Sequence, residues 1–129
     1  MEKRIINPWK WQHERSYVQA VEVKHTEGTL YVSGQTAINA EGISSDADMK
    51  SQLLLALQNL EQVISEAGYE CSGIVRLNIY TTSTAELWPH FNIFKDWIAK
   101  HNIKQSLTLL EVTSLFETLK VELEATVVK

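Results

Sequence analysis

Hydrophobic residues along the 129-residue chain follow two different periods, that of a β-strand and that of a helix. Residues 17–24 and 28–33 show the two-residue alternation of strands on either side of a short polar segment, which predicts a β-hairpin. From Asp46 or Asp48 onward, apolar residues recur every three or four positions until Gly68, which predicts a helix. The acidic residue caps the start of this helix, and the glycine can adopt the left-handed conformation that ends it.

The second half of the chain repeats this succession of strand and helix. Residues 74–82 are predicted to form a strand with one apolar face. A second helix is predicted over residues 89–101, because Pro89 is tolerated only in a first turn, and residues 84–88 are then expected to form a turn or a distorted entry to this helix. Residues 105–115 and 118–128 give two last strands, and the final one alternates an apolar face with a charged face.

The resulting order, β-β-α-β-α-β-β, predicts one α+β domain over residues 1–129, in which two helices cover one face of a mixed sheet. A short strand over residues 3–7 can precede it. The other face of the sheet would stay bare in an isolated chain, so we expect copies of the chain to associate.

The composition of the chain limits the classes of function and the location that are expected. The net charge is −4 and only three residues are arginine, which disfavours general nucleic-acid binding. No apolar run is long enough to cross a membrane. The single cysteine, Cys71, allows no internal disulfide, and no secretion pattern precedes the first strand, so a cytoplasmic location is expected. The histidines lack metal-site spacing and no glycine-rich phosphate loop occurs, so neither a metal nor a cofactor is expected.

Four segments resemble, in order, the RidA-type family of reactive-intermediate (enamine/imine) deaminases: Tyr-Val-Gln-Ala at 17–20, Leu-Tyr-Val-Ser-Gly-Gln-Thr at 30–36, Ala-Leu-Gln-Asn-Leu at 56–60 and Lys-Val-Glu-Leu-Glu-Ala at 120–125. The resemblance implies a chorismate-mutase-like fold and a homotrimer with small-molecule clefts between neighbouring subunits. It also implies hydrolysis of enamines and imines to 2-oxo acids and ammonia, without a cofactor. Some family members have instead been described as ribonucleases or translation inhibitors.

The resemblance also implies residue roles. Glu122 takes the position of the glutamate that orients the attacking water, and Tyr17, Ser33 and Gly34 take positions that line the cleft. The family's arginine, which grips the substrate carboxylate, falls on Leu107. No arginine follows Arg76, so no shift of the alignment restores it.

A lost arginine–carboxylate contact removes about 1.5 to 3 kcal/mol of binding free energy, so we expect the substrate to change before the reaction type does. One hypothesis is an imine or enamine hydrolase in which Glu122 is the general base and the substrate is neutral or is anchored elsewhere. The other is a trimer that binds a small molecule or a protein without turnover. A ribonuclease comes third. Structurally, Glu122 could instead be a solvated residue or a salt-bridged one, with Arg76 as a candidate partner.

The segment before the first long strand holds Trp9, Trp11, His13 and Arg15 within a few residues. The tryptophans are expected to cap a subunit interface. Alternatively, one of them closes the cleft, and Arg15 or His13 replaces the lost cation. The candidate binding residues are therefore Tyr17, Ser33, Gly34, Leu107, Trp11 and Arg15, with Glu122 as the candidate catalytic residue.

Overall fold

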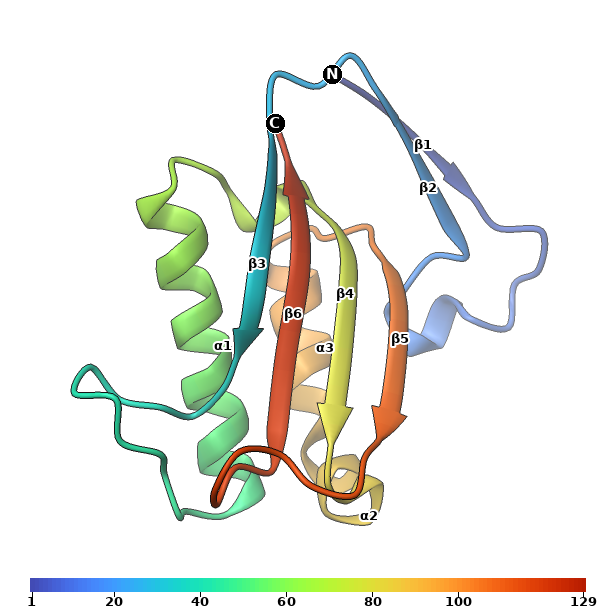
Figure 1. Cartoon of the computed structure of the whole chain (residues 1–129). Coiled ribbons are helices and arrows are strands. Elements are labelled where there is room, and N and C mark those ends of the chain that lie inside the picture. Colours follow the sequence, from blue (N-terminus) through green and yellow to red (C-terminus); the bar gives the residue numbers. More distant parts are fainter.

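The computed structural model describes all 129 residues and shows a mixed sheet with two long helices on one face (Figure 1). The strands are β1 (Glu2–Ile6), β2 (Ala20–Lys24), β3 (Thr29–Gln35), β4 (Ile74–Thr81), β5 (Ser106–Glu111) and β6 (Val121–Val128); the helices are α1 (Met49–Glu66), α2 (Thr84–Leu87) and α3 (Phe91–Lys100), with 3₁₀ turns at His13–Arg15, Cys71–Gly73 and Trp88–His90. The predicted α+β class and the placement of both helices are confirmed. No helix has the combined length and hydropathy that crossing a membrane requires.

Strand pairing differs from the predicted hairpin. The main sheet has the order β3-β6-β4-β5, in which only β4 and β5 run parallel, whereas β2 pairs with β1 as a separate two-stranded ribbon. The hairpin between residues 17–24 and 28–33 is therefore wrong. His25 has a positive φ of 57°, so the chain turns away after β2, and β3 pairs with β6 instead. Figure 1 shows this two-stranded ribbon near the β5 edge of the main sheet, away from the β3 edge.

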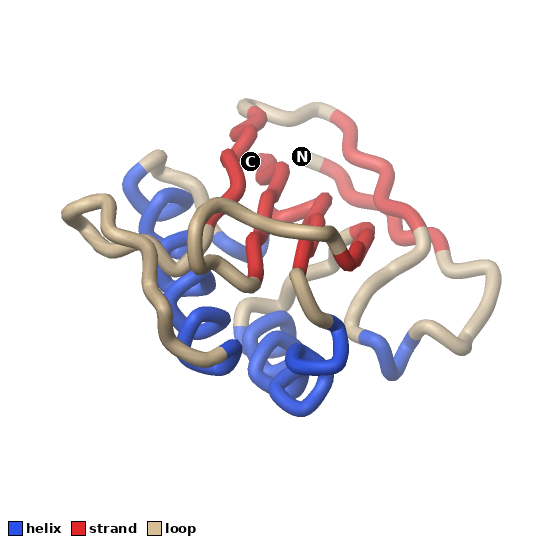
Figure 2. Tube along the Cα trace, turned by 60° about the horizontal axis from the view of Figure 1, so that its bottom comes forward, coloured by secondary structure: helices blue, strands red, loops and turns tan.

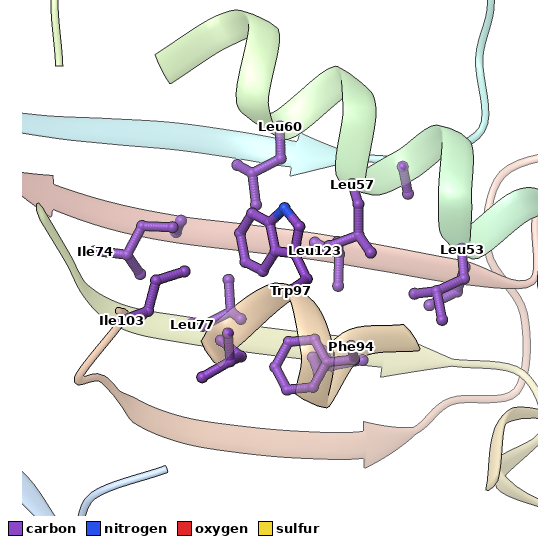
Figure 3. Close-up of a cluster of buried hydrophobic side chains, with 14 of the residues drawn as sticks. Leu53, Leu57, Leu60, Ile74, Leu77, Phe94, Trp97, Ile103 and Leu123 are labelled. Carbon is purple, nitrogen blue, oxygen red and sulfur yellow. The ribbon is translucent and has the colours of Figure 1, made fainter. Parts of the chain in front are cut away.

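Helix α1 is the element that the sequence predicts best. The Asp48 carboxylate accepts a hydrogen bond from the Ser51 backbone N–H at 2.9 Å, which makes Asp48 rather than Asp46 the cap. Gly68 follows the helix with a φ of +78°. The buried face of α1 meets β4, β6 and α3 in one core, shown in Figure 3 by Leu53, Leu57, Leu60, Ile74, Leu77, Phe94, Trp97, Ile103 and Leu123. Strands β4 and β6 therefore have one face in this core and the opposite face turned away from the helices.

The second helical region begins earlier than predicted. Ser83 caps α2 by accepting a hydrogen bond from the Glu86 backbone N–H at 3.1 Å, so of the two alternatives for residues 84–88 the structure has an irregular helical entry rather than a turn. Pro89 lies in the first turn of the 3₁₀ segment that leads into α3, where its missing N–H is tolerated. Figure 2 shows these helical segments side by side below the sheet. The strand predicted over residues 105–115 ends at Glu111, and that over 118–128 begins at Val121.

A fully buried glutamine ties the long connections to the core. The Gln52 side-chain amide donates to the carbonyl oxygens of Ser45, Ala47 and Thr118 at 3.1 to 3.3 Å. Its carbonyl oxygen accepts the Lys120 backbone N–H at 2.8 Å. All four of these side-chain hydrogen bonds go to two loops, one of which leads directly into β6. The start of β6 is thereby fixed against α1.

Candidate functional site

Glu122 lies on the outer face of β6, opposite the helices. Its neighbours Val121 and Leu123 are buried in the core, so the strand alternation places Glu122 on the other side. A β-carbon at Gly34 would lie 2.5 Å from the Glu122 carboxyl carbon and 2.8 Å from one carboxyl oxygen. Only glycine therefore leaves room for this carboxylate against β3. Glu122 and Gly34, which the family resemblance assigns to the cleft, are therefore neighbours within one chain.

Ser33 and Gly34 form an irregularity in β3. Val32 pairs with Ala125 and Gln35 pairs with Leu123, so three steps along β3 match two steps along β6. The extra residue is a β-bulge, a feature that redirects side chains and often lies beside active sites. Both residues are exposed to solvent, next to the half-buried Glu122.

Two carboxylates on this face of β6 have opposite electrostatic environments. Burial, and then the charge of Glu124, raise the pKa of Glu122. Glu124 accepts hydrogen bonds from Asn78 and from the Tyr80 hydroxyl, both at 2.8 Å, and these lower its pKa. Glu122 accepts no hydrogen bond from the chain. Paired acids with pKa values moved in opposite directions are typical of acid–base sites, in which one stays charged and the other exchanges a proton.

Arg76 does not pair with Glu122. Its guanidinium donates to the hydroxyls of Ser106 and Thr108, at 3.4 and 3.1 Å, toward β5. An ion pair between Glu122 and Arg76, one form of the structural explanation for Glu122, is therefore absent.

A second group of candidate residues lines a cavity of about 490 Å³ between β5, α3 and the segment before β2. Arg15, Tyr17 and Leu107 belong to it, together with Glu14, Trp88, Phe91, Lys95 and Leu109. Leu107 and Leu109 also pack against the core. The position at which the family resemblance expects a guanidinium is thus part of an apolar wall.

Gln105 holds the segment around Tyr17 beside the start of β5. Its side-chain amide donates to the Ser16 carbonyl at 3.0 Å, and its backbone carbonyl accepts the Val18 N–H at 3.0 Å. Gln105 is fully buried. These two bonds bring Tyr17 next to Leu107, although the residues are far apart in the sequence.

Trp11 is not in this cavity. It stacks on Trp9 with ring centroids 6.1 Å apart, and the Arg15 guanidinium carbon lies 5.1 Å from the centroid of its ring. Trp9 and Trp11 are both more than half exposed. Trp11 therefore contacts Arg15, which lines the cavity, rather than the cavity itself, and His13 lines a different cavity.

The two groups of candidate residues lie on opposite faces of the sheet. Leu107 pairs with the buried Leu77, whereas Glu122 pairs with Tyr80, whose side chain reaches Glu124 on the outer face. Cross-strand partners share a face, so Leu107 faces the helices and Glu122 faces away from them. A single chain brings Glu122, Ser33 and Gly34 together and Tyr17, Arg15 and Leu107 together, but it does not join the two groups.

Sequence reasoning missed the helical wall of the cavity. Trp88, Phe91 and Lys95 are separated by three and four positions, the spacing that places residues on one face of a helix. The sequence contains this signal, but the predicted helix begins at Pro89 and so leaves Trp88 outside it.

Comparison with known proteins now decides the family. A family model described as Endoribonuclease L-PSP matches residues 10–129. The chain belongs to the RidA/YjgF/L-PSP family. A RutC family protein of Aquifex aeolicus is 31% identical over 113 residues, which cover 88% of each chain. The 2-iminobutanoate/2-iminopropanoate deaminase of Escherichia coli, another relative in this family, is 24% identical over 114 residues, with 88% and 87% covered.

Solved structures of RidA-family proteins share the fold. A Rid-family protein of unknown function from Yersinia pestis, YyfB, matches over the whole of both chains with 29% identity and a TM-score of 0.80. The structure of E. coli TdcF with bound serine matches 88% of this chain and 87% of that one, with 23% identity and a TM-score of 0.72.

Proposed function

We propose that this protein hydrolyses the C=N bond of reactive imines, or of enamines that tautomerise to them, to a carbonyl product and ammonia. Glu122 carries the proposal. It is a half-buried carboxylate with a raised pKa, it lies against the backbone of Gly34, and no group of the chain occupies its hydrogen-bonding oxygens. Such a group is suited to accept a proton from water and to return it later.

The proposed reaction needs only water as co-reactant. The imine reacts in its protonated form. Glu122 takes a proton from a water molecule while the oxygen of that water bonds to the imine carbon and the C=N π electrons move to nitrogen, which gives a neutral carbinolamine. The protonated Glu122 then delivers its proton to the amino nitrogen. As the carbon–nitrogen bond breaks, the hydroxyl oxygen forms the C=O bond and its proton returns to Glu122, which passes it to the departing ammonia. The carbonyl product and ammonium leave, and Glu122 is again ionised.

In this proposal the complete cleft forms between copies of the chain. Tyr17 and Leu107 of one copy would face Ser33, Gly34 and Glu122 of the next, in a homotrimer. The proposal is supported by the separation of the two groups on opposite faces of one chain, and by the family resemblance. It also covers the outer sheet face, which the helices leave bare.

Leu107 would change the substrate preference. Small imino acids would lose the forked contact to their carboxylate, at a cost of about 1.5 to 3 kcal/mol, or about 10-fold to 150-fold in affinity. We therefore propose that small carboxylated imines are poor substrates, and that preferred substrates are neutral or are held by other groups.

The test generates imino acids with an amino-acid oxidase and follows release of 2-oxo acid and ammonia. Glu122→Gln should lower turnover of any accepted imine by about 10²-fold to 10⁴-fold, the usual range for loss of a general base. Glu41→Gln, an exposed glutamate in a loop, is the matched control and should behave like the unmodified protein. Equal turnover by Glu122→Gln would refute the proposed mechanism.

The specificity is tested separately with Leu107→Arg. This change should raise turnover of small carboxylated imines, whereas Leu107→Met, similar in volume and uncharged, should not. No gain with arginine would contradict the role assigned to position 107.

A trimer that binds small molecules without turnover is the second candidate, and the apolar Leu107 favours it. It would be recognised by ligand binding in the absence of any imine hydrolysis. Ribonuclease activity is the third. The net charge of −4 offers little attraction for phosphates, so RNA cleavage should disappear on repurification.

A further inference from the structure

The cavity beside Leu107 has one apolar wall and one charged rim. Trp88, Phe91, Leu107 and Leu109 form the wall, and Trp88 contacts Phe91 edge-on with ring centroids 5.0 Å apart. Glu14, Arg15 and Lys95 form the rim. A site of this kind fits a ligand with a large apolar body and a charged end.

Lys95 is the strongest evidence for the charge of that ligand. It is half-buried on α3, yet it makes no hydrogen bond and no ion pair within the chain. Its ammonium is therefore available to bind an anionic group that enters the cavity. Lys95 also lines the adjoining cavity of about 550 Å³, together with Lys104 and His13. The only carboxylate lining either cavity is that of Glu14.

Arg15 supplies a second cation with a restricted orientation. Its guanidinium lies over the Trp11 ring, a contact that favours a flat, stacked position, and it makes no hydrogen bond or ion pair with a carboxylate. The donors of the guanidinium remain free to bind an acid group. Arg15 and Lys95 therefore place two unpaired cations on the rim, on the segment before β2 and on α3.

The volume of the cavity and the aromatic rings in its wall indicate how large the apolar part of the ligand is. Cavities of about 300 to 1,000 Å³ suit organic molecules larger than a three- or four-carbon acid. A small ligand would leave the Trp88 and Phe91 rings in contact with water, whereas an aromatic or large branched side chain would cover them.

We propose that this cavity binds 2-imino acids and their 2-oxo acid products that carry a bulky apolar side chain, with Lys95 and Arg15 holding the carboxylate. The proposal deepens the proposed hydrolase function and rests on it. In this arrangement the acid group is held from α3 and from the segment before β2, and Leu107 contacts the apolar body of the ligand.

The test measures binding of product analogues to the full-length protein by calorimetry. Phenylpyruvate has both features, pyruvate lacks the apolar body, and phenylacetone lacks the carboxylate. Phenylpyruvate should bind at least about tenfold more tightly than either, because each missing feature removes a contact of that size. Equal affinity for all three compounds would overturn the proposal.

Variants of Lys95 and Trp88 test which residue holds the carboxylate of the ligand and which contacts its apolar side chain. Lys95→Met should weaken phenylpyruvate binding about tenfold and leave phenylacetone binding unchanged, and Lys95→Arg should retain most of the affinity. Lys100→Met, an exposed lysine of the same helix outside the cavity, is the matched control. Trp88→Ala should reduce binding of phenylpyruvate but not of pyruvate. If Lys95→Met bound phenylpyruvate normally, the proposed carboxylate contact would be wrong.

Turnover separates this inference from the proposed function. Tight phenylpyruvate binding without hydrolysis of the corresponding imine would support the ligand class and refute the hydrolase. Hydrolysis of small imines without a preference for bulky ones would support the hydrolase and refute the ligand class.

Discussion

At the scale of single residues, the contact between Gly34 and Glu122 is the most sensitive feature of the candidate site. In Gly34→Ala, the new methyl group would overlap the Glu122 carboxyl, and the flexible glutamate would have to move. We expect kcat/KM to fall about 100-fold, because a displacement of about 1 Å can cost that much, while the melting temperature changes little. Kinetics and calorimetry check this. A loss of stability with unchanged kcat/KM would contradict it.

The pH dependence follows from the same carboxyl group. Glu122 must be ionised to act as a base, and burial and Glu124 raise its pKa. Activity is therefore present above this raised pKa and falls as the pH drops through it, so the acid limb lies at higher pH than for an ordinary glutamate. Glu124→Gln removes the charge and should shift the limb of the kcat/KM profile to lower pH. An unchanged limb would show that Glu124 does not influence Glu122.

Among single residues, the family motif names Glu122, Ser33, Gly34 and Tyr17 as candidates, which they remain, whereas Lys95 was not a candidate from the sequence. The role proposed for Lys95 depends on a lack of partners in the fold, which no sequence pattern records. The same holds for the raised pKa of Glu122, which depends on burial.

At the scale of elements, α1 illustrates what sequence can predict. Its period, cap and terminal glycine are all local signals, and all three are confirmed. The partner of β2 is not a local signal. Alternation identifies a strand, but the choice between β1 and β3 depends on backbone groups that are distant in sequence and on the turn at His25.

The cap of α1 provides a stability test. Asp48→Ala removes the acceptor for the Ser51 N–H and should lower the free energy of unfolding by about 1 kcal/mol. Asp46→Ala, an exposed acid that caps nothing, is the control and should have a much smaller effect. Urea unfolding at a fixed protein concentration measures both. Similar losses for the two variants would contradict the assigned cap.

At the scale of the whole molecule, the two separated groups of candidate residues lead to a complementation test. In the proposed trimer, Glu122→Gln inactivates one half of each cleft and Tyr17→Ala the other. Trimers that contain both kinds of chain have one intact cleft of three by cyclic symmetry, so they should recover about a third of the unmodified turnover. Mixed assemblies can be isolated with two affinity tags, and light scattering gives their mass. Mixed trimers with no activity would refute a shared cleft.

Gln52 has a consequence for redesigning this protein. Its amide fixes Thr118 and Lys120, so the path of the chain into β6 is set independently of most of the preceding loop. Residues 113–115, which lie between the hydrogen-bonded Val112 and Phe116, can therefore be varied in sequence as a library of loop variants. Every loop variant should keep Glu122 in the same position, provided that Gln52 is kept.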